Sequence, residues 1–306
     1  MTQHTRRAVS LGTAVFIAGL GLAPSALANH PVLVEGNCNN ANDPAFSPVP
    51  APGTCGDYDG DGRIGTTEDT DGDRVFGTIN AANNTPTLGA NNNGTITIVA
   101  SGLFAERVNI GNGSGPGNLT LEGAPGVEAN IDAVRQGDAG SGPRQGQPGI
   151  VVNVPANRQV VLRNLQSRNW TSGIQILGDS RVALEGVRAE HNVNYGVEIS
   201  DNARVAISNS EIYGTGRRQN PMTGDFPTAN NPNPGIGIEF DDQSSGTVFD
   251  TRVTGSFRDG VRVSGRGDAK KRVCLAQVNI FDNNPDVSGV KKAGTNCIGT
   301  DGNSDD

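Results

Sequence analysis

A short block recurs through the second half of the chain and limits its possible folds more than any other feature. Each block is a glycine followed by residues in which apolar positions alternate with variable ones, and a second apolar pair follows it. Successive glycines lie 24, 23, 41 and 23 residues apart, so the long step is one period plus an insertion. The block glycines are Gly149, Gly173, Gly196, Gly237 and Gly260.

A period of about 23 residues indicates a solenoid rather than a globular domain. Alternating apolar residues are typical of strands, and the period leaves room for three strands and three turns. The 43 glycines fit a chain that turns every few residues, because glycine tolerates positive φ. The sequence therefore predicts an all-β fold, a right-handed parallel β-helix of roughly eight coils.

The N-terminal residues resemble an export signal. Arg6 and Arg7 precede an apolar run, and a small-residue pattern ends at Ala28. We therefore expect a signal peptide over residues 1–28 and a secreted or cell-surface protein. An uncleaved anchor is the alternative, and the arginine pair leaves open whether export follows the general or the twin-arginine route.

The formal net charge of -8 makes nucleic acid and anionic membranes poor partners. Neutral or calcium-bridged polysaccharide remains compatible with an acidic exported chain. No second apolar segment predicts membrane insertion after the signal. The oligomeric state is left open.

Four cysteines in an exported chain favour disulfides. Three pairings are possible, and the local one joins each pair of neighbours along the chain. A zinc site is the weaker alternative, because no two cysteines have the C-x-x-C spacing. The cysteines are Cys38, Cys55, Cys274 and Cys297.

A twelve-residue acidic segment, residues 57–68, has the spacing of a calcium-binding loop. Gly62 permits the sharp turn at its sixth position. Clustered carboxylates repel one another unless a cation neutralises them, so we expect one bound calcium ion. The expected ligands are Asp57, Asp59, Asp61, the carbonyl of Arg63, and Glu68.

No helix of convincing length flanks this segment, so it resembles an EF-hand or dockerin calcium loop and not an EF-hand pair. Asp69, Asp71 and Asp73 suggest a second ion, but their position twelve is Asn80 rather than glutamate. An acidic linker without metal is the alternative.

These features divide the chain into five parts. A Pro/Asn-rich leader at 29–56 follows the signal, and the acidic loop covers 57–73. The β-helix is expected over 74–298 with an insertion at 214–235, and an acidic tail at 299–306 ends the sequence.

The segments 78–82, 94–110 and 119–123 resemble the opening of pectin-lyase-like and pectinesterase-like β-helix proteins. The resemblance implies a short capping helix before the first strands. Family members include lyases, esterases, epimerases and exported proteins without known activity, so the fold does not assign a function. The catalytic blocks of pectinesterases and of alginate epimerases are missing here, and we assign no catalytic residue and no cofactor other than calcium.

One polar column follows from the predicted register. The variable residue of each block points outward because its apolar neighbours point inward, so these residues stack on one face. β-Helix lyases place calcium-binding acids and a basic group on such a face, where the base takes a proton from a uronate. The alternative is a solvated stripe with one surface ion pair, worth under about 1 kcal/mol. The candidate ligand face comprises Glu198, Glu239, Asp241 and Arg262.

The turns repeat as well. Asn169, Asn192 and Ser256 each precede a block glycine by four residues, which predicts a hydrogen-bonded ladder. The next residue, Trp170 in the first of these turns, suggests an apolar column or a sugar-stacking ring.

The sequence favours an exported, calcium-stabilised β-helix that is non-catalytic and acts in surface association or carbohydrate contact. The alternative is a polysaccharide lyase, which would share the same outward face.

Overall fold

The computed structural model describes residues 32–35, 75–76, 78–84, 94–100, 102–104, 106–111, 117–133, 147–216, 235–264, 273–283 and 286–288. These residues form three parallel sheets and one short helix, α1 (Ile79–Asn83). The predicted signal peptide, the acidic loop, the tail, residues 217–234 of the insertion, and Cys38, Cys55 and Cys297 lie outside the described residues.

Sheet A has nine strands and sheets B and C have seven each. In spatial order, sheet A contains β2 (Val75–Phe76), β1 (Val32–Glu35), β3 (Gly94–Ala100), β6 (Leu119–Gly123), β9 (Gln159–Arg163), β12 (Arg181–Glu185), β15 (Arg204–Ser208), β18 (Ser245–Phe249) and β21 (Val273–Ala276).

Sheet B contains β4 (Gly102–Phe104), β7 (Ala129–Asp132), β10 (Leu165–Arg168), β13 (Arg188–Glu190), β16 (Glu211–Tyr213), β19 (Arg252–Thr254) and β22 (Asn279–Phe281). Sheet C contains β5 (Val108–Ile110), β8 (Ile150–Val152), β11 (Ser172–Ile176), β14 (Tyr195–Ile199), β17 (Ile236–Phe240), β20 (Val261–Val263) and β23 (Val287–Ser288).

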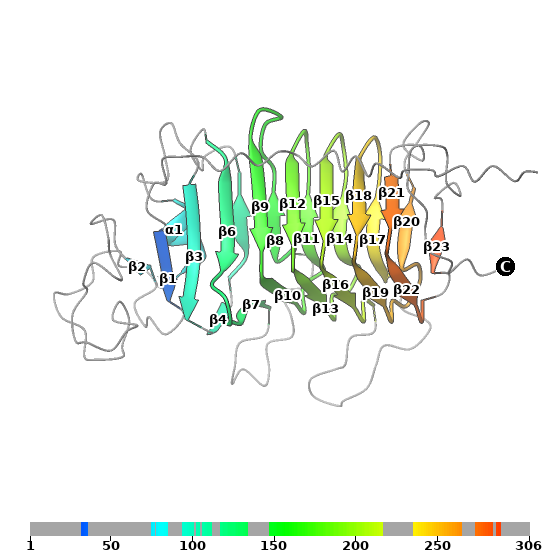
Figure 1. Cartoon of the computed structure of the whole chain (residues 1–306), viewed down its shortest axis with the longest axis horizontal. Coiled ribbons are helices and arrows are strands. Elements are labelled where there is room, and N and C mark those ends of the chain that lie inside the picture. The colour runs from blue at the N-terminus through cyan, green and yellow to red at the C-terminus, as the bar shows by residue number, and fades with distance from the viewer. Residues whose placement is uncertain are drawn as a thin grey trace, which may run out of the picture.

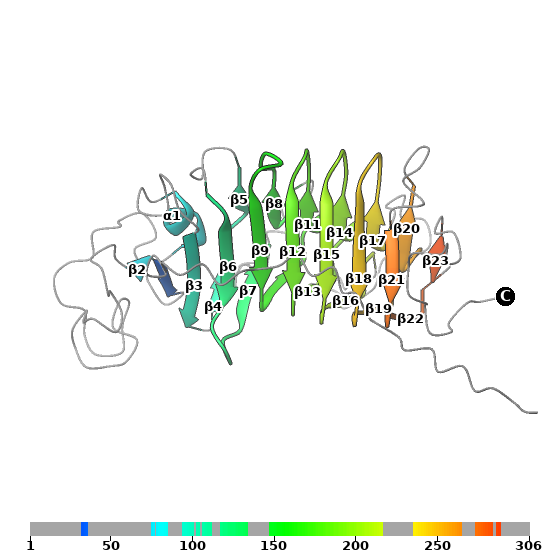
Figure 2. The same ribbon diagram turned by 45° about the horizontal axis from the view of Figure 1, so that its top comes forward.

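The chain visits sheets A, B and C in turn, and each strand pairs in parallel with the equivalent strand of the next coil. The coils stack along the long axis of the molecule (Figures 1 and 2). The predicted right-handed parallel β-helix is therefore confirmed. The described part of the chain holds seven three-strand coils, with β1 and β2 extending sheet A, where the repeat count predicts roughly eight.

The N-terminal end of the stack is closed by α1, which contacts β1, β3 and β5. Its residues Ile79 and Ala82 are fully buried. The Glu106 carboxylate accepts hydrogen bonds from the Ile79 and Asn80 backbone N–H groups at 2.6 and 3.1 Å, which caps the start of the helix. The helix α1 is thus a short capping helix that precedes the three-strand coils. β1 lies within the stretch expected to be a leader and pairs with β3.

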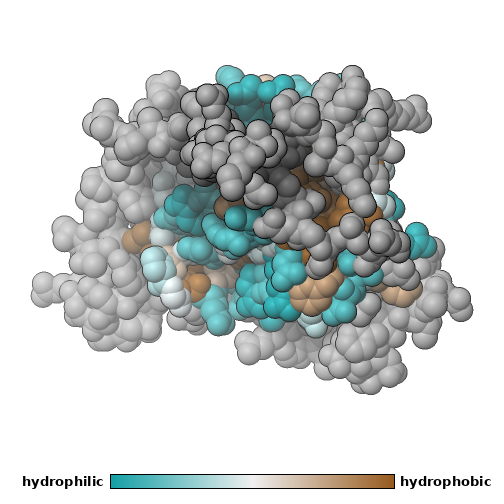
Figure 3. All heavy atoms as spheres, turned by 45° about the vertical axis from the view of Figure 1, so that its right-hand side comes forward, coloured by the Kyte–Doolittle hydropathy of each residue, from teal (hydrophilic) through white to brown (hydrophobic). Residues whose placement is uncertain are grey.

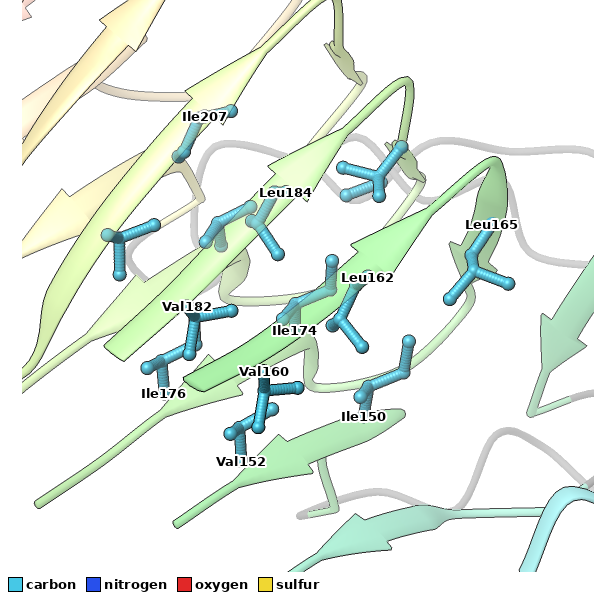
Figure 4. Close-up of a cluster of buried hydrophobic side chains, with 14 of the residues drawn as sticks. Ile150, Val152, Val160, Leu162, Leu165, Ile174, Ile176, Val182, Leu184 and Ile207 are labelled. Atoms are coloured by element: carbon cyan, nitrogen blue, oxygen red, sulfur yellow. The ribbon is translucent and has the colours of Figure 1, made fainter. Parts of the chain in front are cut away.

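The core is a set of aliphatic columns inside the three sheets. Figure 4 shows such residues from neighbouring coils side by side, with Val160 next to Val182 and Leu162 next to Leu184. All four are at most 2% exposed. Because every coil buries its apolar side chains against the next coil, no coil has a core of its own.

The block glycines are required by close packing between coils. A Cβ atom on Gly237 would lie 2.5 Å from the carbonyl oxygen of Gly260 in the next coil and 2.6 Å from Val253 Cγ1. Gly196 meets the carbonyl of Gly237 in the same way, at 2.6 Å. Any side chain here would push neighbouring coils apart, so glycine recurs with the period.

Single residues with positive φ turn the corners between sheets. At the corner from sheet B to sheet C the equivalent residues are Asn169, His191, Gly214, Gly255 and Asp282, with φ between 53° and 68°. At the corner from sheet A to sheet B they are Asn164, Gly186, Asn209, Asp250 and Gln277. Glycine, asparagine and aspartate tolerate this conformation best, which explains their abundance.

The buried polar ladder differs from the predicted one by one position. Sheet B register places Trp170, not Asn169, beside Asn192. The backbone N–H of Trp170 donates to Asn192 Oδ1 at 3.1 Å, and Asn192 Nδ2 donates to the Ser167 carbonyl at 3.2 Å. Asn169 instead occupies the positive-φ corner. Counting from the glycine fails because the coil before Gly173 has a different turn length.

In the described part of the chain, no helix is both long enough and apolar enough to span a bilayer. Cys274 on β21 takes part in a disulfide. Its partner lies outside the described residues, so the predicted pairing stays a prediction.

Candidate functional site

The outer face of sheet C brings the predicted polar column together. Glu198 of β14 pairs with Gln175 of β11 on one side and with Glu239 of β17 on the other. Glu239 in turn pairs with Arg262 of β20. These residues therefore form one row across four coils, as the repeat predicts, and Asp241 lies just beyond Glu239. We call Glu198, Glu239, Asp241 and Arg262 the acidic row.

Glu239 is the most enclosed member, with a side chain only 4% exposed. Its Oε1 accepts hydrogen bonds from Arg262 Nε at 2.8 Å and from Ser264 Oγ at 2.7 Å. Arg262 Nη2 lies 2.7 Å from the same oxygen, and the Tyr195 hydroxyl also bonds to Glu239. The buried charge is thus compensated by several donors, as a carboxylate out of water requires.

Glu198 lies in a different environment one coil away. Its Oε2 accepts hydrogen bonds from Ser172 Oγ at 2.8 Å and Gln175 Nε2 at 3.0 Å. Burial raises the pKa of Glu198, these two bonds lower it, and the charges of Glu239 and Asp241 raise it further. Glu198 therefore holds its proton to a higher pH than an ordinary glutamate.

Tyr195 links the two glutamates. Burial and the charges of Glu239 and Glu198 raise the pKa of Tyr195 to about 12. The phenol therefore stays protonated at neutral pH and serves as a hydrogen-bond donor to Glu239.

The outer end of the acidic row is more open to solvent. Asp241 Oδ1 accepts a hydrogen bond from Ser264 Oγ at 2.9 Å. Asp259 Oδ2 lies 3.9 Å from Arg262 Nη1, which is a loose ion pair. The acidic row and Asp259 together carry four carboxyl groups and one guanidinium, so this surface repels anions once its carboxyl groups are ionised.

A family model for the right handed beta helix region matches residues 148–304 of the chain, which is just over half of it. The chain belongs to the right-handed β-helix family. Comparison with curated proteins finds no match, and comparison with solved structures finds none either. The whole acidic row lies inside the region that matches the family.

In this right-handed β-helix protein, the interpretation of the row as a merely solvated stripe is wrong for Glu239. The register and the outward direction follow from the repeat, whereas the burial of Glu239 and its bonds to Arg262, Ser264 and Tyr195 do not. A cross-coil Glu–Arg pair is present, as that interpretation expects, but one carboxylate is almost completely removed from water.

Sequence reasoning missed Tyr195 and Ser172. Strict alternation from Glu198 turns Tyr195 inward, but the strand pairing passes from Tyr195 to Val197 and skips Gly196. This irregularity places Tyr195 and Ser172 on the same face as the acidic row, where both bond to its glutamates. The signal was the polar residue directly before three of the five block glycines, namely Ser172, Tyr195 and Asp259.

Trp170 is a core residue. It is fully buried, and its Nε1 donates to the Ile131 carbonyl at 2.9 Å. The ring is therefore structural, and its interpretation as a sugar-stacking surface is wrong; the predicted apolar column with Val193 and Phe257 does not form, because Trp170 lies beside Asn192 and those two residues are partly exposed.

Among the described residues, no group of three or more histidine, cysteine, aspartate or glutamate side chains is arranged to hold a metal ion. The predicted calcium ligands, Asp57 to Glu68, lie outside that part of the chain. The calcium site stays a prediction.

Proposed function

We propose that this right-handed β-helix protein contacts carbohydrate through the acidic row on sheet C without turning it over chemically. The observation that supports this most is the row with its two hydrogen-bonded groups, one that joins Ser172 to Glu198 and one that joins Tyr195 and Ser264 to Glu239. It crosses four coils of one sheet, which suits an extended ligand more than a small molecule.

The chemistry of the row suits sugar hydroxyl groups. Ionised carboxylates are acceptors only, and hydroxyl side chains both donate and accept, so together they match the donors and acceptors of a sugar. Asp241 and Glu198 are only partly buried, which leaves them available to a ligand. Because Glu198, Glu239 and Arg262 sit on paired strands and Asp241 directly follows one, little ordering is needed on binding. The excess of carboxyl groups favours a neutral glycan over a polyanion.

Chemical turnover by β-elimination has less support. A lyase would need Arg262 to take a proton from the substrate, but Arg262 donates through Nε and approaches Glu239 through Nη2. A protonated guanidinium has no acceptor atom, so it cannot take up a further proton.

Export and calcium stabilisation belong to the same proposal. Their support is in the sequence, namely the export-signal pattern at 1–28 and the twelve-residue loop at 57–68. A disulfide at Cys274 fits an oxidising compartment.

The test is a calorimetric titration of the protein with cellohexaose, a neutral linear hexasaccharide. We expect Glu198→Gln and Asp241→Asn each to weaken binding at the acidic row about tenfold, because an ionic acceptor is lost. Glu185→Gln is the matched control, since Glu185 lies on sheet A and pairs with Arg163.

Incubation with hexagalacturonate should give no unsaturated product by ultraviolet absorbance. Wild-type protein that fails to bind cellohexaose, or row variants that bind it as tightly as the control variant, would overturn the proposal. Release of unsaturated product would favour the lyase alternative.

A further inference from the structure

The outer face of sheet B carries an aromatic pair that the acidic row does not use. Tyr213 ends β16 and Phe281 ends β22, and both pair with Thr254 of β19. The two rings therefore lie in one outward row, two coils apart, with a small residue between them. Two parallel-strand spacings put them about 10 Å apart along the stack.

Both rings are accessible. Tyr213 is 43% exposed and is one of two large hydrophobic residues in the described chain that are exposed, while Phe281 is partly exposed. Thr254, between them, is buried. A ligand on this face would thus meet the two rings together with the exposed side chains of Arg188 and Arg252.

Contacts from neighbouring coils hold the rings in position. The ring of His191 meets Tyr213 edge to face, with centroids 5.0 Å apart and planes at 79°. Burial lowers the pKa of His191. The charge of Glu190 raises this pKa and the charge of Arg168 lowers it further. The imidazole is therefore neutral at neutral pH. On the other ring, the Arg252 guanidinium carbon lies 5.1 Å from the Phe281 centroid.

The charges beside the rings balance one another. Glu211 lies between two arginines, 3.3 Å from Arg188 and 3.6 Å from Arg252. Arg188 also approaches Glu190 at 3.9 Å. Two arginines and two glutamates leave this strip without net charge, so it offers nothing to attract a strongly charged partner.

We propose that Tyr213 and Phe281 form an aromatic platform that stacks on neutral pyranose rings of a linear glycan. The inference rests on the proposed carbohydrate contact for its ligand class, but it assigns a second surface on a different sheet. The apolar face of a sugar ring packs on an aromatic ring, and the nearby arginine and glutamate side chains bond its hydroxyls.

The size of the platform favours sugar over a protein partner. A stable protein interface buries on the order of 800 Å² per partner around a continuous apolar centre. Here two separate rings are flanked by charged side chains. Viewed toward the C-terminal coils, the described side chains are mainly hydrophilic with separate hydrophobic patches (Figure 3). Individual sugar rings match separate aromatic rings.

The test is a titration with cellohexaose of Tyr213→Ala and Phe281→Ala, with Phe249→Ala as the matched control. Phe249 is 40% exposed but lies on sheet A. We expect each platform variant to weaken binding at this site at least fivefold, and the control to bind as the wild type does. Tyr213→Phe and Phe281→Tyr should retain binding, which separates a lost ring from a folding defect.

The titration tests the acidic row and the aromatic platform separately. Wild-type protein should bind two cellohexaose molecules, and Glu198→Gln should weaken only the binding on sheet C. If the acidic row binds nothing, Glu198→Gln leaves binding unchanged while Tyr213→Ala still weakens the remaining binding at least fivefold. Platform variants that bind like Phe249→Ala, or wild-type protein that binds no cellohexaose, would overturn the platform.

Discussion

Replacing Arg262 by methionine removes the main charge partner of Glu239 and keeps most of the side-chain length. The Glu239 side chain is 4% exposed and that of Arg262 is 28% exposed, so the carboxylate would stay buried without its counter-ion. Breaking a buried pair by removing one partner typically costs about 3–5 kcal/mol. Ser264 and Tyr195 still donate to Glu239, so we expect a loss of about 2–3 kcal/mol in the free energy of unfolding.

Urea unfolding followed by far-UV circular dichroism measures this loss. Arg188→Met is the control, because Arg188 is 55% exposed, pairs with Glu211 on the surface, and should change stability by under about 0.5 kcal/mol. Adding Glu239→Gln to Arg262→Met should recover at least half of the lost stability, since no buried charge remains. A loss below about 0.5 kcal/mol in Arg262→Met, or no recovery in the double variant, would refute the reasoning.

Three further outcomes are expected. The raised pKa of Glu198 means that the folded protein holds this proton more tightly than the unfolded chain does. The free energy of unfolding therefore falls as pH rises from about 4.5 through the raised pKa. Glu198→Gln should flatten that slope in urea midpoints measured across this pH range. An unchanged slope would contradict it. Asn192→Ala leaves the Trp170 N–H unpaired in the core and should cost about 2 kcal/mol by thermal or urea unfolding, whereas a cost near zero would mean that the ladder bonds are dispensable. Replacing Asp57 and Asp61 together by alanine should abolish calcium binding in calorimetry, and retained tight binding would rule out the loop.

The coil architecture could be predicted because one local pattern repeats. Alternating apolar residues at a constant period specify both strand direction and register, and Gly196, Gly237 and their equivalents mark the same place in each coil. The reason for those glycines was less accessible. Their Cβ atoms would meet carbonyl groups of the next coil, a contact between residues far apart in the sequence.

The candidate site could be predicted only as a row. The outward direction of Glu198, Glu239 and Arg262 follows from alternation, but burial depends on what packs over a strand. The skipped pairing at Gly196, which turns Tyr195 to the outer face, breaks the alternation on which the prediction depends. The ladder was predicted at Asn169 but lies at Trp170, because the turn before Gly173 differs in length from the equivalent turns.

The aromatic platform could not be predicted from the repeat. Tyr213 and Phe281 are 68 residues apart in the sequence. They lie in one row of sheet B because both are strand partners of Thr254. Neither belongs to a block that begins with glycine, so only the sheet B register brings them together.

Carbodiimide labelling of carboxyl groups, read by mass spectrometry with and without cellohexaose, tests the carbohydrate contact at the acidic row most directly. The account predicts that the ligand reduces labelling of Glu198 and Asp241 and leaves Glu185 and Asp250 unchanged, since Glu185 lies on sheet A and Asp250 is exposed at the corner from sheet A to sheet B. Equal labelling of Glu198 and Asp241 with and without a saturating concentration of the sugar would contradict it.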